Sequence, residues 1–321
     1  MKRLRNYVLY IFVLLAYQFA AVCPVTEKEI LLQFKGNISS DPYNSLSSWD
    51  SSKSVCQDFS GVFCNPAGNV HKILLWNTSL AGILSPALSG LKYLRILSFF
   101  GNKFSGNIPI EYSDIDTLWK MNFSSNSLSG QIPDFLRKFS NIRYLDLSSN
   151  EYSGEIPSAL FRNCFNVKFI SQSRNKLSGS IPLAIWKCFN LLGVDFSFNN
   201  LSGDLPPQIC DISGLVYFSV RNNGFAQTVE EQILRCKSLE YLDLSSNMFT
   251  GMQALIRAQV AIRAQRALIK CFFVDIYQNI QDYDISNIEE SSASGKLIDW
   301  HDEEGFPAEN PSPEIVDQEC Q

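Results

Sequence analysis

A thirteen-residue pattern recurs along most of the sequence and constrains the fold more than any other feature. Its clearest copy reads Leu-Asp-Leu-Ser-Ser-Asn-Glu-Tyr-Ser-Gly-Glu-Ile-Pro at residues 145–157, and successive copies are 24 residues apart, with one step of 25. A period of this length with these features predicts a solenoid of stacked short coils. Thr78 holds the asparagine position in the first of eight copies, and the others carry Asn102, Asn126, Asn150, Asn175, Asn199, Asn223 and Asn247.

Each position of the pattern has a mechanical reason. Side chains alternate along a strand, so Leu145 and Leu147 should face inward and Asp146 outward. An asparagine amide can satisfy backbone groups that the following turn leaves without partners, and stacking should align these amides in a ladder. The glycine tolerates positive φ, and the proline fixes φ where no ladder N–H is needed.

One such coil cannot bury its apolar edge alone, so several must stack. The predicted fold is therefore an α/β-type solenoid, a leucine-rich-repeat right-handed superhelix with a parallel sheet on its concave face and a helical N-terminal cap. An ordinary parallel α/β protein is the alternative, but it would require helical periodicity between the strands, and the sequence has none.

The sequence suggests five segments. The first has a charged start (Lys2, Arg3, Arg5) and a short apolar run, which is typical of a secretory signal; retention as an N-terminal anchor is the alternative. The second contains a predicted helix from Glu27 to Ser39, and the seventh repeat is degenerate. In order, we predict a signal peptide at 1–23, a cap at 24–71, eight repeats at 72–251, an amphipathic capping helix at 252–281 and an acidic disordered tail at 282–321.

The composition argues against chemistry and against nucleic acids. The 321 residues carry a formal charge of −5 and only two histidines, so the sequence shows no nucleic-acid footprint, metal site or cofactor site. Asp146, Asp195 and Asp243 recur at one strand position, which indicates a scaffold role rather than paired catalytic carboxylates. We therefore expect no enzyme activity.

The nine cysteines divide into groups. Cys56 and Cys64 close a short loop just before the first repeat and predict a disulfide. The next three, Cys164, Cys188 and Cys236, each precede their repeat's asparagine by eleven residues, in a column that is apolar in the other repeats, which predicts free buried thiols. The pairing of Cys23, Cys210, Cys271 and Cys320 stays open.

A family resemblance becomes specific before the repeats begin. The stretch Ile30-Leu31-Leu32-Gln33-Phe34-Lys35, the run from Asp41 to Trp49 and the following cysteine pair resemble the N-terminal cap of plant receptor-like kinases. The Leu-Ser-Gly-x-Ile-Pro form of the repeats is similar to that plant class, and the resemblance covers about residues 24–251.

The resemblance implies a cell-surface ectodomain without catalytic residues. Such ectodomains bind a protein, peptide or small-molecule extracellular ligand and recruit a co-receptor kinase. Residues 252–321 show no spanning helix and no kinase motif, so we expect a truncated or alternatively spliced form. It would be secreted to the apoplast, or associated with the plasma membrane if the first segment is retained. A secreted inhibitor of cell-wall hydrolases, similar to polygalacturonase inhibitors, is the alternative function.

The outward strand positions are the best candidates for ligand contact. Exposed aromatic and arginine side chains are typical of binding surfaces, although aromatics also favour strands for packing reasons. Lys72, Arg95, Lys120, Lys168 and Tyr241 fall at the same positions. The predicted ligand-binding residues are Trp76, Phe100, Trp119, Arg143, Tyr144, Phe169, Arg174, Phe198, Tyr217 and Arg221.

Four sequons predict N-glycosylation, at Asn37, Asn77, Asn122 and Asn200. Asn77 and Asn122 should lie on or beside the strands of the binding face. Glycans on both would cover the surface near Trp76 and Phe100 and would shift binding to later repeats or to a flank.

Overall fold

The fold is described from a computed structural model of the chain, which defines residues 25–205, 207–226, 236 and 238–250. The chain divides into two compact units, Met1–Ser153 with Arg162–Asn166 (the N-terminal unit) and Gly154–Phe161 with Val167–Gln321 (the C-terminal unit). The predicted signal peptide, the predicted helix at 252–281 and the acidic tail lie outside the described residues, as do Cys23, Cys271 and Cys320.

The N-terminal unit begins with helix α2, Glu27–Gly36. A capping box starts the helix: Thr26 Oγ1 accepts a hydrogen bond from Glu29 N, and the Glu29 carboxylate accepts one from Thr26 N. The helix ends at Gly36, so the prediction that it continues to Ser39 was wrong. The reason is that Ile38–Ser40 forms a strand, β1, which pairs with a later strand. A one-turn helix, α3 (Val55–Asp58), follows in the cap.

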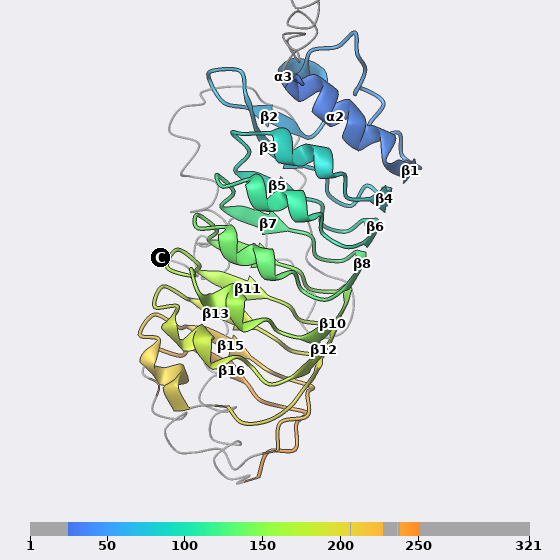
Figure 1. Cartoon of the computed structure of the whole chain (residues 1–321). Helices are drawn as coiled ribbons and strands as arrows, with labels where there is room; N and C mark the ends of the chain where they lie inside the picture. Colours follow the sequence, from blue (N-terminus) through green and yellow to red (C-terminus); the bar gives the residue numbers. More distant parts are fainter. Residues whose placement is uncertain (1–24, 206, 227–235, 237, 251–321) are drawn as a thin grey trace, which may run out of the picture. The chain divides into compact units, whose positions relative to one another are not determined.

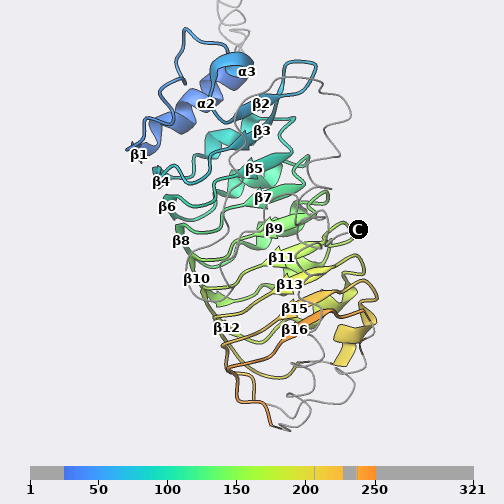
Figure 2. The same ribbon diagram turned by 180° about the vertical axis from the view of Figure 1, so that it is seen from behind.

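The repeats place a first row of parallel strands side by side (Figures 1 and 2). Each strand comes from the Leu-x-Leu part of one coil, and β3, β5, β7 and β9 pair in register. β2 adds an antiparallel strand at the free edge of β3, so that the cap closes this sheet. In the N-terminal unit the first row is β2 (Val62–Cys64), β3 (Val70–Leu74), β5 (Ile96–Ser98), β7 (Lys120–Asn122) and β9 (Tyr144–Asp146). In the C-terminal unit it is β11 (Phe169–Ser171), β13 (Gly193–Asp195), β15 (Tyr217–Ser219) and β16 (Tyr241–Asp243).

A second row of short strands follows the asparagine of each coil and was not predicted from the sequence. These strands pair in parallel within each unit, and β1 closes the free edge of β4 in antiparallel fashion. The row contains β1, β4 (Ala81–Ile83), β6 (Lys103–Gly106), β8 (Ser127–Gly130) and β10 (Glu151–Glu155), and in the C-terminal unit β12 (Lys176–Gly179) and β14 (Asn200–Leu201).

Short 3-10 helices return the chain to the next strand. Most begin directly after the proline of the Ile-Pro pair, whose fixed φ suits the entry of a helix. They are η1 (Pro86–Gly90), η2 (Ile110–Asp114), η3 (Asp134–Lys138), η4 (Ser158–Phe161), η5 (Leu183–Lys187) and η6 (Pro207–Asp211).

The repeat asparagines form hydrogen-bonded ladders inside both units. Asn150 is typical: its Nδ2 group donates to the carbonyl oxygens of Phe123, Leu147 and Ser148, and its Oδ1 atom accepts from Leu128 N. The bonds to Phe123 and Leu128 connect Asn150 to the preceding coil. Each asparagine therefore satisfies the turn of its own coil and fastens that coil to its neighbour.

Apolar side chains from the coils and the cap fill the N-terminal unit. Phe99 stacks on Phe123 with ring centroids 5.5 Å apart, and Phe34 of α2 stacks on Phe99 at 5.2 Å. Trp49 stacks on Phe59 and donates from Nε1 to the carbonyl oxygen of Ser60. The cap thus continues the core of the first coils and covers their end.

Candidate ligand-binding face

The sheet face comprises the side chains that point away from the core along the first row of strands, together with the residues just before and after each strand. In the N-terminal unit it carries four half-buried aromatic residues and two exposed arginines, Arg95 and Arg143. Trp76 Nε1 donates to Ser98 Oγ at 2.8 Å, which orients the indole ring across two coils. The half-buried aromatic residues are Trp76, Phe100, Trp119 and Tyr144.

A buried charge pair lies among these aromatic residues. Lys120 Nζ sits 5.0 Å from the centre of the Tyr144 ring, and Asp146, although it points away from the core, is only 4% exposed. Burial lowers the pKa of Lys120 to about 8, against the attraction of Asp146, while repulsion from Lys72 lowers it further. Burial raises the pKa of Asp146, although Ser148, Tyr144 and Lys120 favour its charged form.

Two predicted ligand-binding residues of the C-terminal unit are buried, so the prediction of their exposure was wrong. Phe169 is 6% exposed and Tyr217 is 7% exposed. Between them lies Gly193, whose missing side chain leaves room for the Phe169 ring: a Cβ atom on Gly193 would come within 2.7 Å of it. Tyr217 is covered on its other side by Tyr241, whose ring is parallel and 4.5 Å away.

The last strand of the C-terminal unit adds charge to this aromatic stack. Tyr241 OH donates to Asp243 Oδ2 at 3.3 Å, and the Arg221 guanidinium lies 3.9 Å from the same oxygen. Burial raises the pKa of Tyr241, and the Asp243 carboxylate raises it further. Asp243 was interpreted as scaffold only; its role in holding Arg221 was missed because it depends on a neighbouring coil.

An exposed cluster of three predicted residues lies beside this stack. The Arg174 guanidinium lies 4.4 Å from the centre of the Phe198 ring, and the Arg221 guanidinium lies 5.6 Å from it. Both arginines are exposed and Phe198 is half-buried. Two cations therefore flank one aromatic ring; we call these three residues the Arg–Phe–Arg cluster.

The backbone at two members of this cluster is unusual. Arg174 and Phe198 immediately precede a ladder asparagine and have φ values of 52° and 53°. That left-handed conformation is unfavourable for a bulky side chain, and other coils place Ser125, Ser149 or Ser246 there. The neighbouring asparagine ladder holds the conformation, so large side chains are presented on the sheet face at a cost in backbone strain.

All six cysteines in the described part of the chain are disulfide-bonded. Cys56 and Cys64 form a disulfide with Cα atoms 5.5 Å apart, which confirms the predicted pair. The prediction of free thiols was wrong: Cys164 and Cys188 are disulfide-bonded, and Cys236 pairs with Cys210. The last pair was missed because Cys210 lies two residues off the column, and stacking of consecutive coils brings these two positions to a Cα separation of 4.9 Å.

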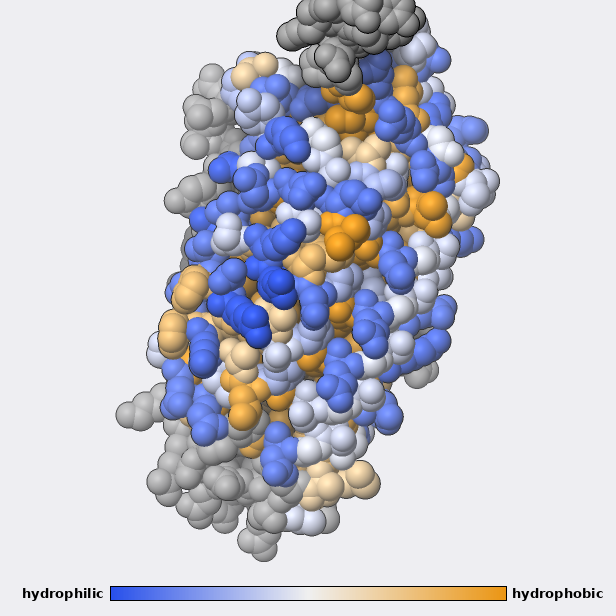
Figure 3. Space-filling view, viewed as in Figure 1, coloured by the Kyte–Doolittle hydropathy of each residue, from blue (hydrophilic) through white to orange (hydrophobic). Residues whose placement is uncertain are grey.

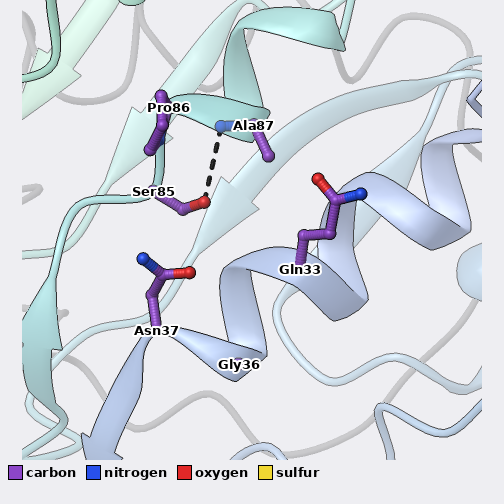
Figure 4. A pocket seen from close by; sticks show the side chains of 6 residues that line it. All are labelled: Gln33, Gly36, Asn37, Ser85, Pro86 and Ala87. Atoms are coloured by element: carbon purple, nitrogen blue, oxygen red, sulfur yellow. Dashed lines mark hydrogen bonds between the residues drawn. The ribbon is translucent and has the colours of Figure 1, made fainter.

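The four sequons lie in different surroundings. Asn77 and Asn200 are exposed, whereas Asn122 is 5% exposed and its Oδ1 atom accepts hydrogen bonds from both N and Oγ of Ser124. Asn37 follows helix α2 and lines an open hollow of about 610 Å³ with Gln33, Gly36, Ser85, Pro86 and Ala87 (Figure 4). This hollow lies between α2 and η1, apart from the sheet face.

Other kinds of site find little support among the described residues. No group of three or more His, Cys, Asp or Glu side chains there could hold a metal ion, and none of the helices there is long and apolar enough to cross a membrane. Figure 3 shows hydrophilic side chains over most of one surface, with apolar side chains in separate patches. The exposed apolar residues include Ile110 and Leu183, each at the start of a 3-10 helix.

Comparison with known families finds matches for both the N-terminal cap and the repeats. Residues 25–65 match the leucine rich repeat N-terminal domain, and residues 117–139, 141–163 and 238–255 match the leucine rich repeat. The chain therefore combines a leucine rich repeat N-terminal domain with leucine rich repeats. Its fold is accordingly the predicted leucine-rich-repeat solenoid, with parallel strands in each unit.

Relatives of this leucine-rich-repeat protein are plant receptor kinases. It is 40% identical over 86 residues to pollen receptor-like kinase 1 and 41% identical over 90 residues to the protein MALE DISCOVERER 2, both from Arabidopsis thaliana. These matches cover 26% and 27% of the chain but only 13% of each relative. The chain thus spans a small part of the length of the curated relatives it matches.

Solved structures of receptor ectodomains have the same fold. The structure of PEPR1 with AtPEP1 superposes with a TM-score of 0.65 at 27% identity, covering 70% of this chain and 32% of that one. The Arabidopsis receptor kinase HAESA, in complex with the peptide hormone IDA and the co-receptor SERK1, gives a TM-score of 0.60 at 26% identity, covering 69% and 42%. HAESA is thus a receptor kinase that was solved with a bound peptide hormone.

Proposed function

We propose that this leucine-rich-repeat protein is an extracellular recognition module that binds a peptide on its sheet face and then associates with a co-receptor kinase. The observation that carries the proposal is the Arg–Phe–Arg cluster, which exposes two guanidinium groups on either side of a half-buried ring. Such a cluster suits a ligand that has an acidic group next to an apolar one.

Three further features support this role. Phe198 occupies a left-handed backbone position where serine would be less strained, and strain of this kind is concentrated at functional sites. Asp243 holds Arg221, so the guanidinium is oriented before a ligand arrives. The structural neighbour HAESA was solved with the peptide hormone IDA and the co-receptor SERK1, and PEPR1 was solved with AtPEP1. The signal-like segment at 1–23 is consistent with secretion.

The proposal can be tested with the full chain secreted from a eukaryotic host. An array of synthetic secreted-type peptides identifies one binder, and calorimetry then measures its affinity for wild type and two variants. Phe198→Ser restores the side chain that other coils carry at this position, and it should weaken binding by about tenfold or more. Phe189→Ser, at an exposed phenylalanine outside the sheet face of the same unit, should change affinity less than about twofold.

Two outcomes would contradict the proposal. The first is equal weakening by both variants, which would place binding elsewhere. The second is that the full chain binds no peptide but inhibits a cell-wall polygalacturonase, which would favour the secreted inhibitor. Peptide-dependent association with a SERK-type co-receptor ectodomain is a separate readout for the co-receptor part of the proposal.

A further inference from the structure

The sheet face of the N-terminal unit carries one cation on each of its four coils. Lys72 lies on β3 and Lys120 on β7, whereas Arg95 and Arg143 directly precede β5 and β9. The register pairs Lys72 with Ile96, Ile96 with Lys120 and Lys120 with Tyr144, so the cations follow one another across adjacent strands. Adjacent strands are about 4.8 Å apart, which sets the step between successive cations.

The two arginines leave this row of charge open to solvent. Arg95 and Arg143 are both exposed, and neither makes an ion pair with another described residue. Their backbone positions are fixed, because Trp119 N donates to the carbonyl oxygen of Arg95 at 3.0 Å and Arg143 N donates to that of Trp119 at 2.8 Å. The backbone positions of Arg95 and Arg143 therefore lie two strand spacings apart, about 10 Å.

Little negative charge offsets these cations locally. Within residues 71–77, 95–101, 119–125 and 143–149 the only acidic residue is Asp146, which is buried beside Lys120. Lys120 is itself buried and partly balanced, so the exposed charges on this face are those of Arg95 and Arg143, beside the half-buried Lys72. This face is basic, although the chain as a whole carries a net charge of −5.

Aromatic side chains lie along the same face. Trp76 is held by its hydrogen bond to Ser98, and Trp119 lies between Arg95 and Arg143 in the row. A half-buried indole that is fixed in orientation, such as that of Trp76, offers a flat face on which the C–H groups of sugar rings pack well. Cations beside indoles suit an acidic sugar better than they suit a small inorganic anion.

The spacing argues for a polysaccharide rather than a peptide. An extended acidic peptide presents side chains on one side only every second residue, about 6.7 Å apart, and so falls out of step with the strands. A chain of hexuronate rings carries one carboxylate on every ring, with a ring-to-ring repeat of the same order as the strand spacing. Carboxylates two rings apart can therefore reach Arg95 and Arg143, which lie two strands apart.

We propose that the strip formed by Lys72, Arg95 and Arg143 with Trp76 and Trp119 binds a linear acidic polysaccharide. This site is separate from the Arg–Phe–Arg cluster and goes beyond peptide recognition. Binding is reversible and involves no bond-making. Its free energy comes from ion pairing along the row and from contact with the indoles, so it should weaken as salt is added.

The test uses the secreted full chain after enzymatic removal of N-glycans, so that no glycan at Asn77 covers the strip. Size-fractionated oligogalacturonate is the probe, and its methyl-esterified form is the matched neutral ligand. Heparin distinguishes sulfated from carboxylated chains, while poly-glutamate and duplex DNA represent the other linear polyanions. We expect binding of oligogalacturonate or heparin, no binding of the ester, and at least tenfold weaker binding of poly-glutamate and DNA.

Matched double variants locate the site. Arg95→Gln with Arg143→Gln should weaken polysaccharide binding about tenfold or more and reduce the slope of log affinity against log salt by about one to two. Arg137→Gln with Lys138→Gln removes the same charge from exposed η3 of the same unit and should change affinity less than about twofold. Arg95→Lys with Arg143→Lys keeps the charge and should retain most of the binding, which separates lost charge from misfolding.

Three results would overturn the proposal: equal losses in the two glutamine double variants, undiminished binding of the methyl ester, or poly-glutamate or DNA binding as tightly as the polysaccharide. Failure here leaves peptide recognition intact, because the peptide assay depends on Phe198 of the C-terminal unit. Conversely, a chain that binds no peptide but passes these tests would contradict only the proposed function.

Discussion

The side-chain nitrogen of Asn102 donates a hydrogen bond of 2.7 Å to the carbonyl oxygen of Leu75, 27 residues earlier in the sequence and one coil away in the structure. The same nitrogen also donates to the carbonyl oxygen of Phe99, and Oδ1 accepts from Leu80 N. One side chain therefore completes a turn and joins two coils. The sheet face is held in place by this repeated bond.

Removal of one ladder amide should be costly. Asn150→Ala leaves the carbonyl oxygens of Phe123 and Leu147 and the N–H of Leu128 without partners in a buried setting. We expect the free energy of unfolding to fall by about 2–4 kcal/mol, measured by chemical denaturation. Asn141→Ala removes an exposed amide that bonds to Asp116 and should cost less than about 1 kcal/mol. Similar losses in the two variants would argue against the ladder.

A buried glutamine interrupts the apolar core of the C-terminal unit. Gln172 is 0% exposed, and neither atom of its amide has a hydrogen-bond partner among the described residues. We expect Gln172→Leu to raise the free energy of unfolding by about 1–3 kcal/mol, because it removes an unsatisfied buried amide. Gln33→Leu, on exposed α2, serves as a control with little change. A destabilised Gln172→Leu variant would show that the amide has a partner after all. Other coils have an apolar residue at this position: Leu75, Phe99, Phe123, Leu147, Phe196, Val220 and Leu244.

The buried Lys120 should make stability depend on pH in the alkaline range. Its pKa is about 8 in the folded protein, against 10.5 in the unfolded chain, so between these values the unfolded state binds more protons. Stability from this group therefore rises as pH increases from about 8 to 10.5. Relative to Lys120→Met, wild type should gain up to about 3 kcal/mol over this window.

Comparison with Lys120→Met also removes a confounding effect. Burial raises the pKa of Tyr217 and Tyr241, and ionisation of tyrosines in the unfolded state destabilises both proteins equally at high pH. The difference in unfolding free energy between wild type and variant then reports Lys120. A difference that stays constant between pH 8 and 10.5 would mean that Lys120 titrates normally.

The sequons should differ in occupancy. Asn122 is buried, and its Oδ1 atom accepts a hydrogen bond from Ser124, so there is little space for a glycan to extend from this side chain. Asn77 and Asn200, by contrast, are exposed, and Asn37 borders an open hollow. Glycopeptide mapping of the secreted full chain should therefore find glycans at Asn37, Asn77 and Asn200 and an unmodified Asn122. Full occupancy of Asn122 would contradict the structure around β7.

The repeat pattern in the sequence was sufficient to predict the structural features that are determined within a single coil. The strand that contains Leu145, the turn at Asn150 and the short loop between Cys56 and Cys64 each follow from local sequence. The structure has all three, with the strand at Tyr144–Asp146. The end of α2 was misplaced because the pairing of β1 with β4 overrides the helical pattern.

Features that depend on neighbouring coils were not predictable in this way. Phe169 is buried because Gly193 of the next coil has no side chain, and a single repeat gives no sign of this. Cys236 finds Cys210 across a coil boundary, two positions off the expected column. The Arg–Phe–Arg cluster combines residues from three successive coils, and the predicted set named its members without showing that they meet.

Hydroxyl-radical footprinting of the full chain with its array-selected peptide tests the central claim most directly, because it reads side-chain accessibility over the whole surface at once. Peptide recognition by the sheet face predicts protection of Phe198 and Tyr241, with unchanged oxidation of the exposed Tyr93 and Phe189. Protection of Tyr93 or Phe189 with unaltered Phe198 would contradict it.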